Sequence, residues 1–172
     1  VGSSFEQAVG LCRRHPRLDV GVHLTLVGER PLTDPRRLGD LVTEDGRFVE
    51  SHPALVSRAL TLRLDREAVT RELEAQIEKV ERAGIRPTHV DGHQHVHLLP
   101  GVWPAVVGLA RKHGIQWVRV PAFAPLAAGR WRGRCRYHRL GRPELRPDGA
   151  HSTSTYSKQS WRTAPYEPAA KA

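Results

Sequence analysis

The strongest chemical signal in the sequence is a cluster of histidines that begins at residue 89. Within nine residues it holds four of the ten histidines of the chain and one aspartate: His89, Asp91, His93, His95 and His97. All five occupy odd positions, so an extended backbone would place their side chains on one side. Imidazole and carboxylate groups together suit zinc or a similar divalent ion. The cluster therefore predicts a metal site.

The length of a strand limits how many of these residues can bind one ion. At about 3.3 Å per residue, His89 and His97 would lie roughly 26 Å apart on a straight strand. At most two or three neighbours can therefore be ligands, and Gly92 is the expected place for the backbone to bend out of the strand. The alternative interpretation is a polar strand end whose histidines hydrogen-bond to loops.

A further candidate ligand, His23, lies well upstream of the cluster. Between Leu18 and Leu26 large aliphatic residues alternate with polar or small ones, which predicts a strand with His23 on its polar face. In parallel α/β folds, ligand sites collect at the carboxyl ends of strands. His23 and the cluster both lie near such ends, so we expect them to meet.

Hydrophobic periodicity predicts the elements that would position these residues. Helices are expected over residues 5–15, 66–83 and 100–113. Strands are expected over residues 18–26, 88–91 and 115–120, and residues 28–53 are expected to be loop. The charged residues of the second helix are expected on a solvated face: Glu67, Glu72, Glu74, Glu78 and Glu81 with Arg71, Lys79 and Arg82. This order favours a parallel α/β domain over residues 1–123.

The positive charge of the chain is concentrated after residue 123. Of the formal net charge of +9, residues 1–123 contribute +2 (17 Lys+Arg, 15 Asp+Glu) and residues 124–172 contribute +7 (10 and 3). The second stretch is rich in Arg and Pro and poor in large aliphatic residues, which predicts a disordered basic tail. A nucleic-acid-binding arm at residues 130–146 is the alternative, and the near-neutral charge of the remainder argues against it.

No membrane or secretion signal is visible in the sequence. No apolar run reaches the roughly 18 residues that a membrane span needs, and residues 1–15 lack the layout of a signal peptide. Cys12 and Cys135 do not have CxxC spacing, so free thiols in a reducing compartment are expected. We therefore expect a cytoplasmic protein.

Two motifs stand in order along the chain. The first is Gly-Val-His-Leu-Thr-Leu at residues 21–26, followed by Pro31-Leu32. The second is longer and more specific, and it runs from Pro87 to Pro100 as Pro-Thr-His-Val-Asp-Gly-His-Gln-His-Val-His-Leu-Leu-Pro. Together they resemble the YdjC-type carbohydrate deacetylases, which include chitooligosaccharide deacetylase. The resemblance covers about residues 1–121.

The resemblance implies a fold, a reaction and roles for the histidines. The fold would be a distorted (β/α) barrel of the polysaccharide-deacetylase type, and the reaction would be hydrolysis of N-acetyl groups on chitin-derived oligosaccharides. A divalent metal ion, Mg²⁺ or Zn²⁺, would be bound by His23 and His93. Asp91 would orient His93 or assist a water molecule. The remaining histidines would surround the ligands or bind substrate: His89, His95 and His97.

The family pattern also contains parts that have no counterpart in this sequence. Its anionic metal ligand belongs to an Asp-Asp pair on the first barrel strand, and a His-Pro motif near its C-terminus carries a further catalytic histidine. Their absence from these 172 residues predicts an incomplete barrel, weak metal binding and little or no activity. Unpaired strand surface could also associate with another chain, so a homo-oligomer is a further expectation. A non-catalytic metal-binding protein is the alternative function.

Overall fold

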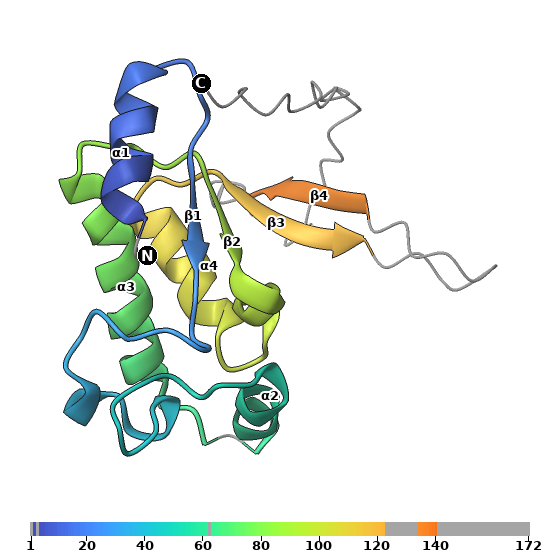
Figure 1. The fold of residues 1–172 in the computed structure, drawn as a ribbon. Helices are drawn as coiled ribbons and strands as arrows, with labels where there is room; N and C mark the ends of the chain where they lie inside the picture. The colour runs from blue at the N-terminus through green and yellow to red at the C-terminus, as the bar shows by residue number, and fades with distance from the viewer. Residues whose placement is uncertain (1, 3, 62, 123–133, 141–172) are drawn as a thin grey trace, which may run out of the picture.

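The computed structural model describes residues 2, 4–61, 63–122 and 134–140, which form a sheet with helices packed against it (Figure 1). The strands are β1 (Gly21–Leu24), β2 (His89–Gly92), β3 (Trp117–Ala122) and β4 (Arg134–Arg139). The α-helices are α1 (Phe5–Arg14), α2 (His52–Leu60), α3 (Arg66–Arg82) and α4 (Trp103–Lys112). Three short 3₁₀ helices are η1 (Pro35–Arg37), η2 (Gly39–Leu41) and η3 (His93–Leu98).

The sheet has the order β1-β2-β3-β4, and its first three strands are parallel. The strand–helix–strand alternation of the sequence is therefore confirmed as a mixed α/β fold with a mostly parallel sheet. In the register, Gly21 lies beside His89 and His23 beside Asp91, while His89 lies beside Trp117 on the other side. Strands from distant parts of the chain thus bring the two histidine motifs into adjacent positions.

The core lies between the sheet and helices α3 and α4, which cover one face of the sheet (Figure 1). The sheet contributes Val22, Leu24, Val90 and Val118, and the helices contribute Leu73, Ile77, Val106, Leu109 and Ala110, all at most 3% exposed. In β1, Val22 and Leu24 are buried while His23 is exposed, as the alternation predicts. Side chains at odd positions of β1 are therefore on the face away from the core.

Helix α3 forms where its sequence predicts it. Asp65 caps it by accepting a hydrogen bond from the Glu67 backbone N–H, and Gly84 follows its end with a φ of 80°.

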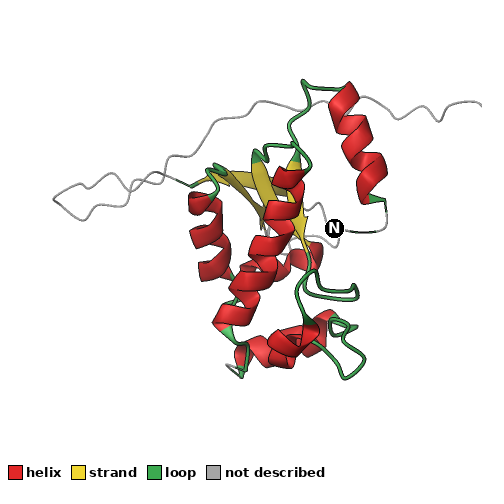
Figure 2. Cartoon of the chain, turned by 90° about the vertical axis from the view of Figure 1, so that its left-hand side faces the viewer, coloured by secondary structure: helices red, strands yellow, loops and turns green. Residues whose placement is uncertain are grey.

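The helix α1, which follows the N label in Figure 2, stands apart from the helices that cover the sheet. Lys79 Nζ of α3 lies 5.1 Å from the centroid of the Phe5 ring, and Arg13 donates to the Ala83 carbonyl.

Residues 28–53, expected to be loop, contain more structure than composition indicates. They include η1, η2 and an antiparallel bridge between Val42 and Phe48 around the turn at Gly46. Phe48 is fully buried, so this segment contributes to the core. Helix α2 was not expected; its Leu55 and Ala59, four residues apart, are both buried. None of the described helices is long and apolar enough to cross a membrane.

Residues 134–139 form strand β4, which corrects the prediction of a disordered tail for these six residues. It pairs antiparallel with β3, from Trp117 beside Arg139 to Ala122 beside Arg134. Its sequence is mostly polar, and its pairing with β3, the preceding strand, stabilises it, so composition does not reveal it. The remainder of residues 124–172, including most of the nucleic-acid-arm prediction at 130–146, lies outside the described residues. The domain boundary at residue 123 stays a prediction.

Candidate functional site

Three adjacent strands carry a hydrogen-bonded row of polar side chains on the face away from the core. His23 Nδ1 of β1 lies 2.8 Å from Asp91 Oδ1 of β2, and Arg119 Nη1 of β3 donates to Asp91 Oδ2 at 3.0 Å. Burial opposes ionisation of Asp91, but the hydrogen bonds from His23 and Arg119 outweigh it and lower the pKa of this carboxyl. Asp91 is thus a charged group held from both sides.

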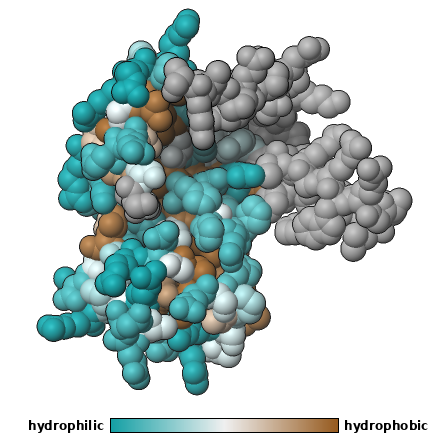
Figure 3. Space-filling view, in the orientation of Figure 1, coloured by the Kyte–Doolittle hydropathy of each residue, from teal (hydrophilic) through white to brown (hydrophobic). Residues whose placement is uncertain are grey.

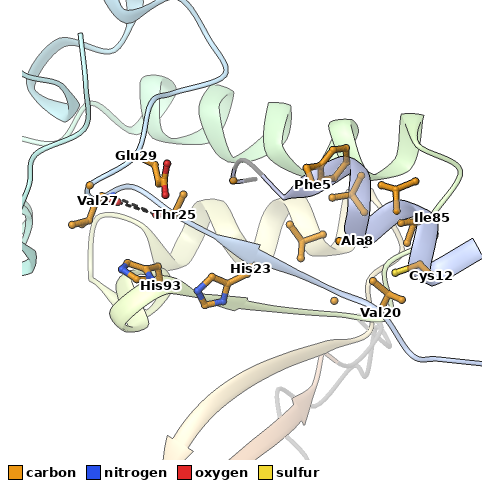
Figure 4. A pocket seen from close by; sticks show the side chains of 16 residues that line it. Phe5, Ala8, Cys12, Val20, His23, Thr25, Val27, Glu29, Ile85 and His93 are labelled. Carbon is orange, nitrogen blue, oxygen red and sulfur yellow. Dashed lines mark hydrogen bonds between the residues drawn. The ribbon is translucent and has the colours of Figure 1, made fainter. Parts of the chain in front are cut away.

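His93, the residue after β2, lies next to this row. Its ring centroid is 5.7 Å from that of His23, and the two rings meet edge to face at 84° (Figure 4). A zinc–nitrogen bond is about 2.0–2.1 Å, which puts each ring centroid about 3.2 Å from a bound ion. Two rings at a tetrahedral angle would then be roughly 5.2 Å apart, and no more than about 6.4 Å. The observed separation fits one shared ion.

The donor atoms of this pair are compatible with such an ion. Nδ1 of His23 is engaged by Asp91, which leaves Nε2 for a metal, and the side chain of His23 is 56% exposed. A carboxylate behind a coordinating imidazole is a common arrangement in metal sites. Among the described residues, no group of three or more His, Cys, Asp and Glu side chains has the geometry of a metal site. The His23–His93 pair offers two imidazole nitrogens.

The backbone after β2 turns sharply, two residues later than expected. Gly92 is extended, with φ −149° and ψ 146°, whereas Gln94 and His95 adopt left-handed conformations with φ of 48° and 60°. The expected bend at Gly92 is therefore found at Gln94 and His95. This turn ends the one-sided arrangement that the odd positions indicated, because a strand period no longer applies beyond it.

His97 points into the protein interior and is fully buried. Its Nε2 lies 2.7 Å from the backbone carbonyl oxygen of Arg119, and because a carbonyl only accepts, Nε2 carries the proton. Nδ1 is then unprotonated, and it is buried without a partner among the described residues. Burial lowers the pKa of His97, against the opposing effect of the hydrogen bond to Arg119. The ring rests on Gly92, where a Cβ would lie 2.5 Å from Nδ1.

His89 and His95 do not join the His23–His93 pair. The His89 ring covers Gly21, its Nδ1 lies 3.0 Å from Thr88 Oγ1, and its centroid is 5.0 Å from that of Tyr137. Burial lowers the pKa of His89, although the nearby Asp91 raises it. His95 lies in the left-handed turn with a buried Nδ1 that has no partner within the described part of the chain.

A buried polar network holds the loop that follows β1, and sequence reasoning did not find it. Glu72 is 0% exposed, which corrects its assignment to a solvated face of α3. Its carboxylate accepts hydrogen bonds from Leu32 N, Thr33 N, Thr33 Oγ1 and Gln76 Nε2. Gln76 in turn bonds both backbone groups of Thr25, two residues after His23. In the sequence, the only indication of this network was the spacing of Glu72 and Gln76, which lie four residues apart on α3.

A groove of about 380 Å³ lies between α1 and β1 and reaches the candidate site. His23 and His93 line one end, and Phe5, Ala8 and Ile85 line the other (Figure 4). On the face shown in Figure 3, apolar patches interrupt an otherwise hydrophilic surface. Cys12, also in the groove, is a free thiol, as expected.

Comparison with known proteins identifies the family of the chain. The model of the YdjC-like protein family matches residues 1–170. The chain belongs to the YdjC-like family. The match confirms the resemblance to this family, and it extends beyond residue 121, where the expected resemblance ended.

Curated relatives of this YdjC-like chain are named as deacetylases. It is 38% identical over 117 residues to a carbohydrate deacetylase of Brevibacillus brevis, covering 68% of this chain and 44% of that protein. It is 41% identical over 108 residues to a carbohydrate deacetylase of Geobacillus stearothermophilus, covering 63% and 40%. A chitooligosaccharide deacetylase of Yersinia pestis is 38% identical over 112 residues, covering 64% and 42%. The chain thus spans less than half the length of these relatives.

One solved structure is similar to this chain. It is named as a cellobiose-phosphate cleavage protein from Enterococcus faecalis V583 and matches with a TM-score of 0.56 and 29% sequence identity. The match covers 65% of this YdjC-like chain and 42% of that protein.

Proposed function

We propose that this YdjC-like chain is the metal-binding part of a hydrolase that removes N-acetyl groups from chitin-derived oligosaccharides. The names of the curated relatives support the reaction class. The observation that carries the proposal is the 5.7 Å separation of the His23 and His93 rings, beside a carboxylate that orients one of them. His23 and His93 would be the metal ligands. The parallel sheet would be part of a distorted (β/α) barrel.

The residues of the site have separable roles in this proposal. A divalent ion supplies, when bound, polarisation of the amide carbonyl and a water molecule of lowered pKa. Asp91 orients His23, because its Oδ1 contacts His23 Nδ1 rather than His93. Both Asp91 oxygens already accept hydrogen bonds and its pKa is lowered, so it is a poor proton acceptor. Arg119 keeps Asp91 in its charged, orienting form.

The donor set favours zinc over magnesium and predicts weak binding. Mg²⁺ prefers oxygen ligands, whereas imidazole suits zinc. Two neutral imidazoles provide no charge to offset that of the ion. We therefore expect zinc binding to be measurable and hydrolysis by this chain to be slow.

Zinc titration and acetate release from N,N′-diacetylchitobiose test the proposal together. We expect zinc binding that is lost in His23→Ala and His93→Ala but retained in His15→Ala, an exposed histidine outside the site. Acetate release should be slow, require zinc and disappear in His93→Ala. If neither His23→Ala nor His93→Ala changes zinc affinity, the proposed site is wrong. Rapid release by this chain would contradict the incomplete ligand set.

A non-catalytic metal-binding protein is the second candidate function. The presence of only neutral ligands in the described residues favours it, because activation of water benefits from a complete ligand set. Zinc binding through His23 and His93 with no acetate release at high protein concentration would support this alternative over a hydrolase.

A further inference from the structure

The turn that carries His93 is held in a conformation that its sequence does not favour. Gln94 and His95 both have positive φ, and neither is glycine. Left-handed backbone at such residues is strained and persists only where surrounding contacts hold it. The position of His93 at the start of this turn therefore depends on what fixes the far end of η3.

His97 provides that attachment. Its ring is fully buried, its Nε2–H donates to the Arg119 carbonyl of β3 at 2.7 Å, and it packs directly on Gly92 of β2. Gly92 lacks the Cβ that would lie 2.5 Å from the ring, so the close approach depends on glycine at this position. One side chain thus ties η3 to two strands of the sheet.

The same arginine also belongs to the row of hydrogen bonds that positions the other candidate ligand. The Arg119 backbone accepts from His97, while its guanidinium holds Asp91 at 3.0 Å. Asp91 in turn contacts His23 at 2.8 Å. His97 therefore links the turn bearing His93 to Arg119, and Arg119 holds the carboxylate that orients His23.

We propose that His97 is a positioning residue, whose bond to the Arg119 carbonyl holds the turn so that His93 and His23 face one ion. The proposal rests on the proposed function, since it concerns the geometry of the same metal site. His97 does not touch the ion. It acts through the backbone of the turn and through Arg119.

Two substitutions of His97 separate positioning from general stabilisation. His97→Gln keeps an N–H donor at nearly the reach of Nε2, whereas His97→Leu fills the space without a donor. Val106→Ala is the matched control, because it weakens the buried core at α4, an element separate from η3. For each protein, the zinc dissociation constant and the thermal midpoint would be measured. The zinc-free protein would also be tested for an NMR contact between the His23 and His93 rings.

We expect His97→Leu to weaken zinc binding by about 10–100-fold, the usual effect of losing a partner behind a metal site. His97→Gln should stay close to the unmodified protein, and Val106→Ala should keep its zinc affinity despite a lower midpoint. Unchanged affinity in His97→Leu, or an equal loss in Val106→Ala, would overturn the proposal. If the unmodified protein binds no zinc, the proposed function fails. In that case the NMR contact between the His23 and His93 rings tests the positioning role by itself. It should vanish in His97→Leu and persist in His97→Gln, and its survival in His97→Leu would refute the positioning role.

Discussion

Replacing Glu72 tests whether the buried network behind β1 stabilises the fold as its contacts indicate. The carboxylate is 0% exposed and accepts hydrogen bonds from Leu32 N, Thr33 N, Thr33 Oγ1 and Gln76 Nε2. Glu72→Leu leaves all four donors without this acceptor. A hydrogen bond to a charged group contributes about 1.5–3 kcal/mol, while an unsatisfied buried donor costs about 1–3 kcal/mol.

Two effects reduce the sum of these contributions. The Leu32 and Thr33 donors lie in a partly exposed loop and can turn to water, and removing the carboxylate relieves its own desolvation. We therefore expect Glu72→Leu to lower the free energy of unfolding by about 3 kcal/mol, which corresponds to a fall of roughly 10 °C in the thermal midpoint. Glu72→Gln, which keeps one acceptor oxygen, should cost less.

Urea unfolding followed by circular dichroism measures this difference. Glu78→Gln is the control, because Glu78 lies on the same helix with a 44% exposed side chain and should change stability by less than about 0.5 kcal/mol. If Glu72→Leu is no more destabilising than Glu78→Gln, the network does not hold the loop and the reasoning fails.

Three further predictions concern the site itself. Gly92→Ala should cost about 2 kcal/mol in urea unfolding, because its Cβ would meet the fully buried His97 ring at 2.5 Å. Gly21→Ala, which faces the only partly buried His89 ring, should cost clearly less, and equal costs would contradict this. Asp91→Asn should weaken zinc binding about tenfold in a calorimetric titration, since the orienting charge on His23 is lost; unchanged affinity would remove that role. Because burial lowers the pKa of His97, the unfolded chain takes up a proton there before the folded one does as pH falls below about 6.5. Stability should therefore decline below that pH, with a shallower decline in His97→Gln, and identical slopes would refute this cause.

Local patterns in the sequence were enough to predict the three parallel strands and helices α3 and α4, which enclose much of the core. The alternation around His23 gave its exposed position between Val22 and Leu24, and capping residues gave the limits of α3. Parallel strands bring their carboxyl ends together, so the meeting of His23 and His93 could also be predicted. These features depend on periodicity and chain order, which a single sequence contains.

The features that were missed depend on contacts between distant segments. Glu72 is buried because the loop at Leu32 folds over it, and β4 exists because β3 offers it an edge. Asp91 was expected to orient His93, but the sheet register places it beside His23. The bend was expected at Gly92 because glycine tolerates unusual backbone angles, whereas tertiary contacts hold the left-handed turn two residues later, at Gln94 and His95. No local pattern encodes these choices.

X-ray absorption at the zinc edge tests the central claim most directly, because it counts the imidazoles around the ion. With zinc added to the unmodified chain, we expect two histidine nitrogens at about 2.0–2.1 Å, whereas His23→Ala and His93→Ala should show no histidine-bound zinc because each loses the site. An ion whose histidine coordination is the same in the unmodified chain and in both variants would show that His23 and His93 do not form the metal site.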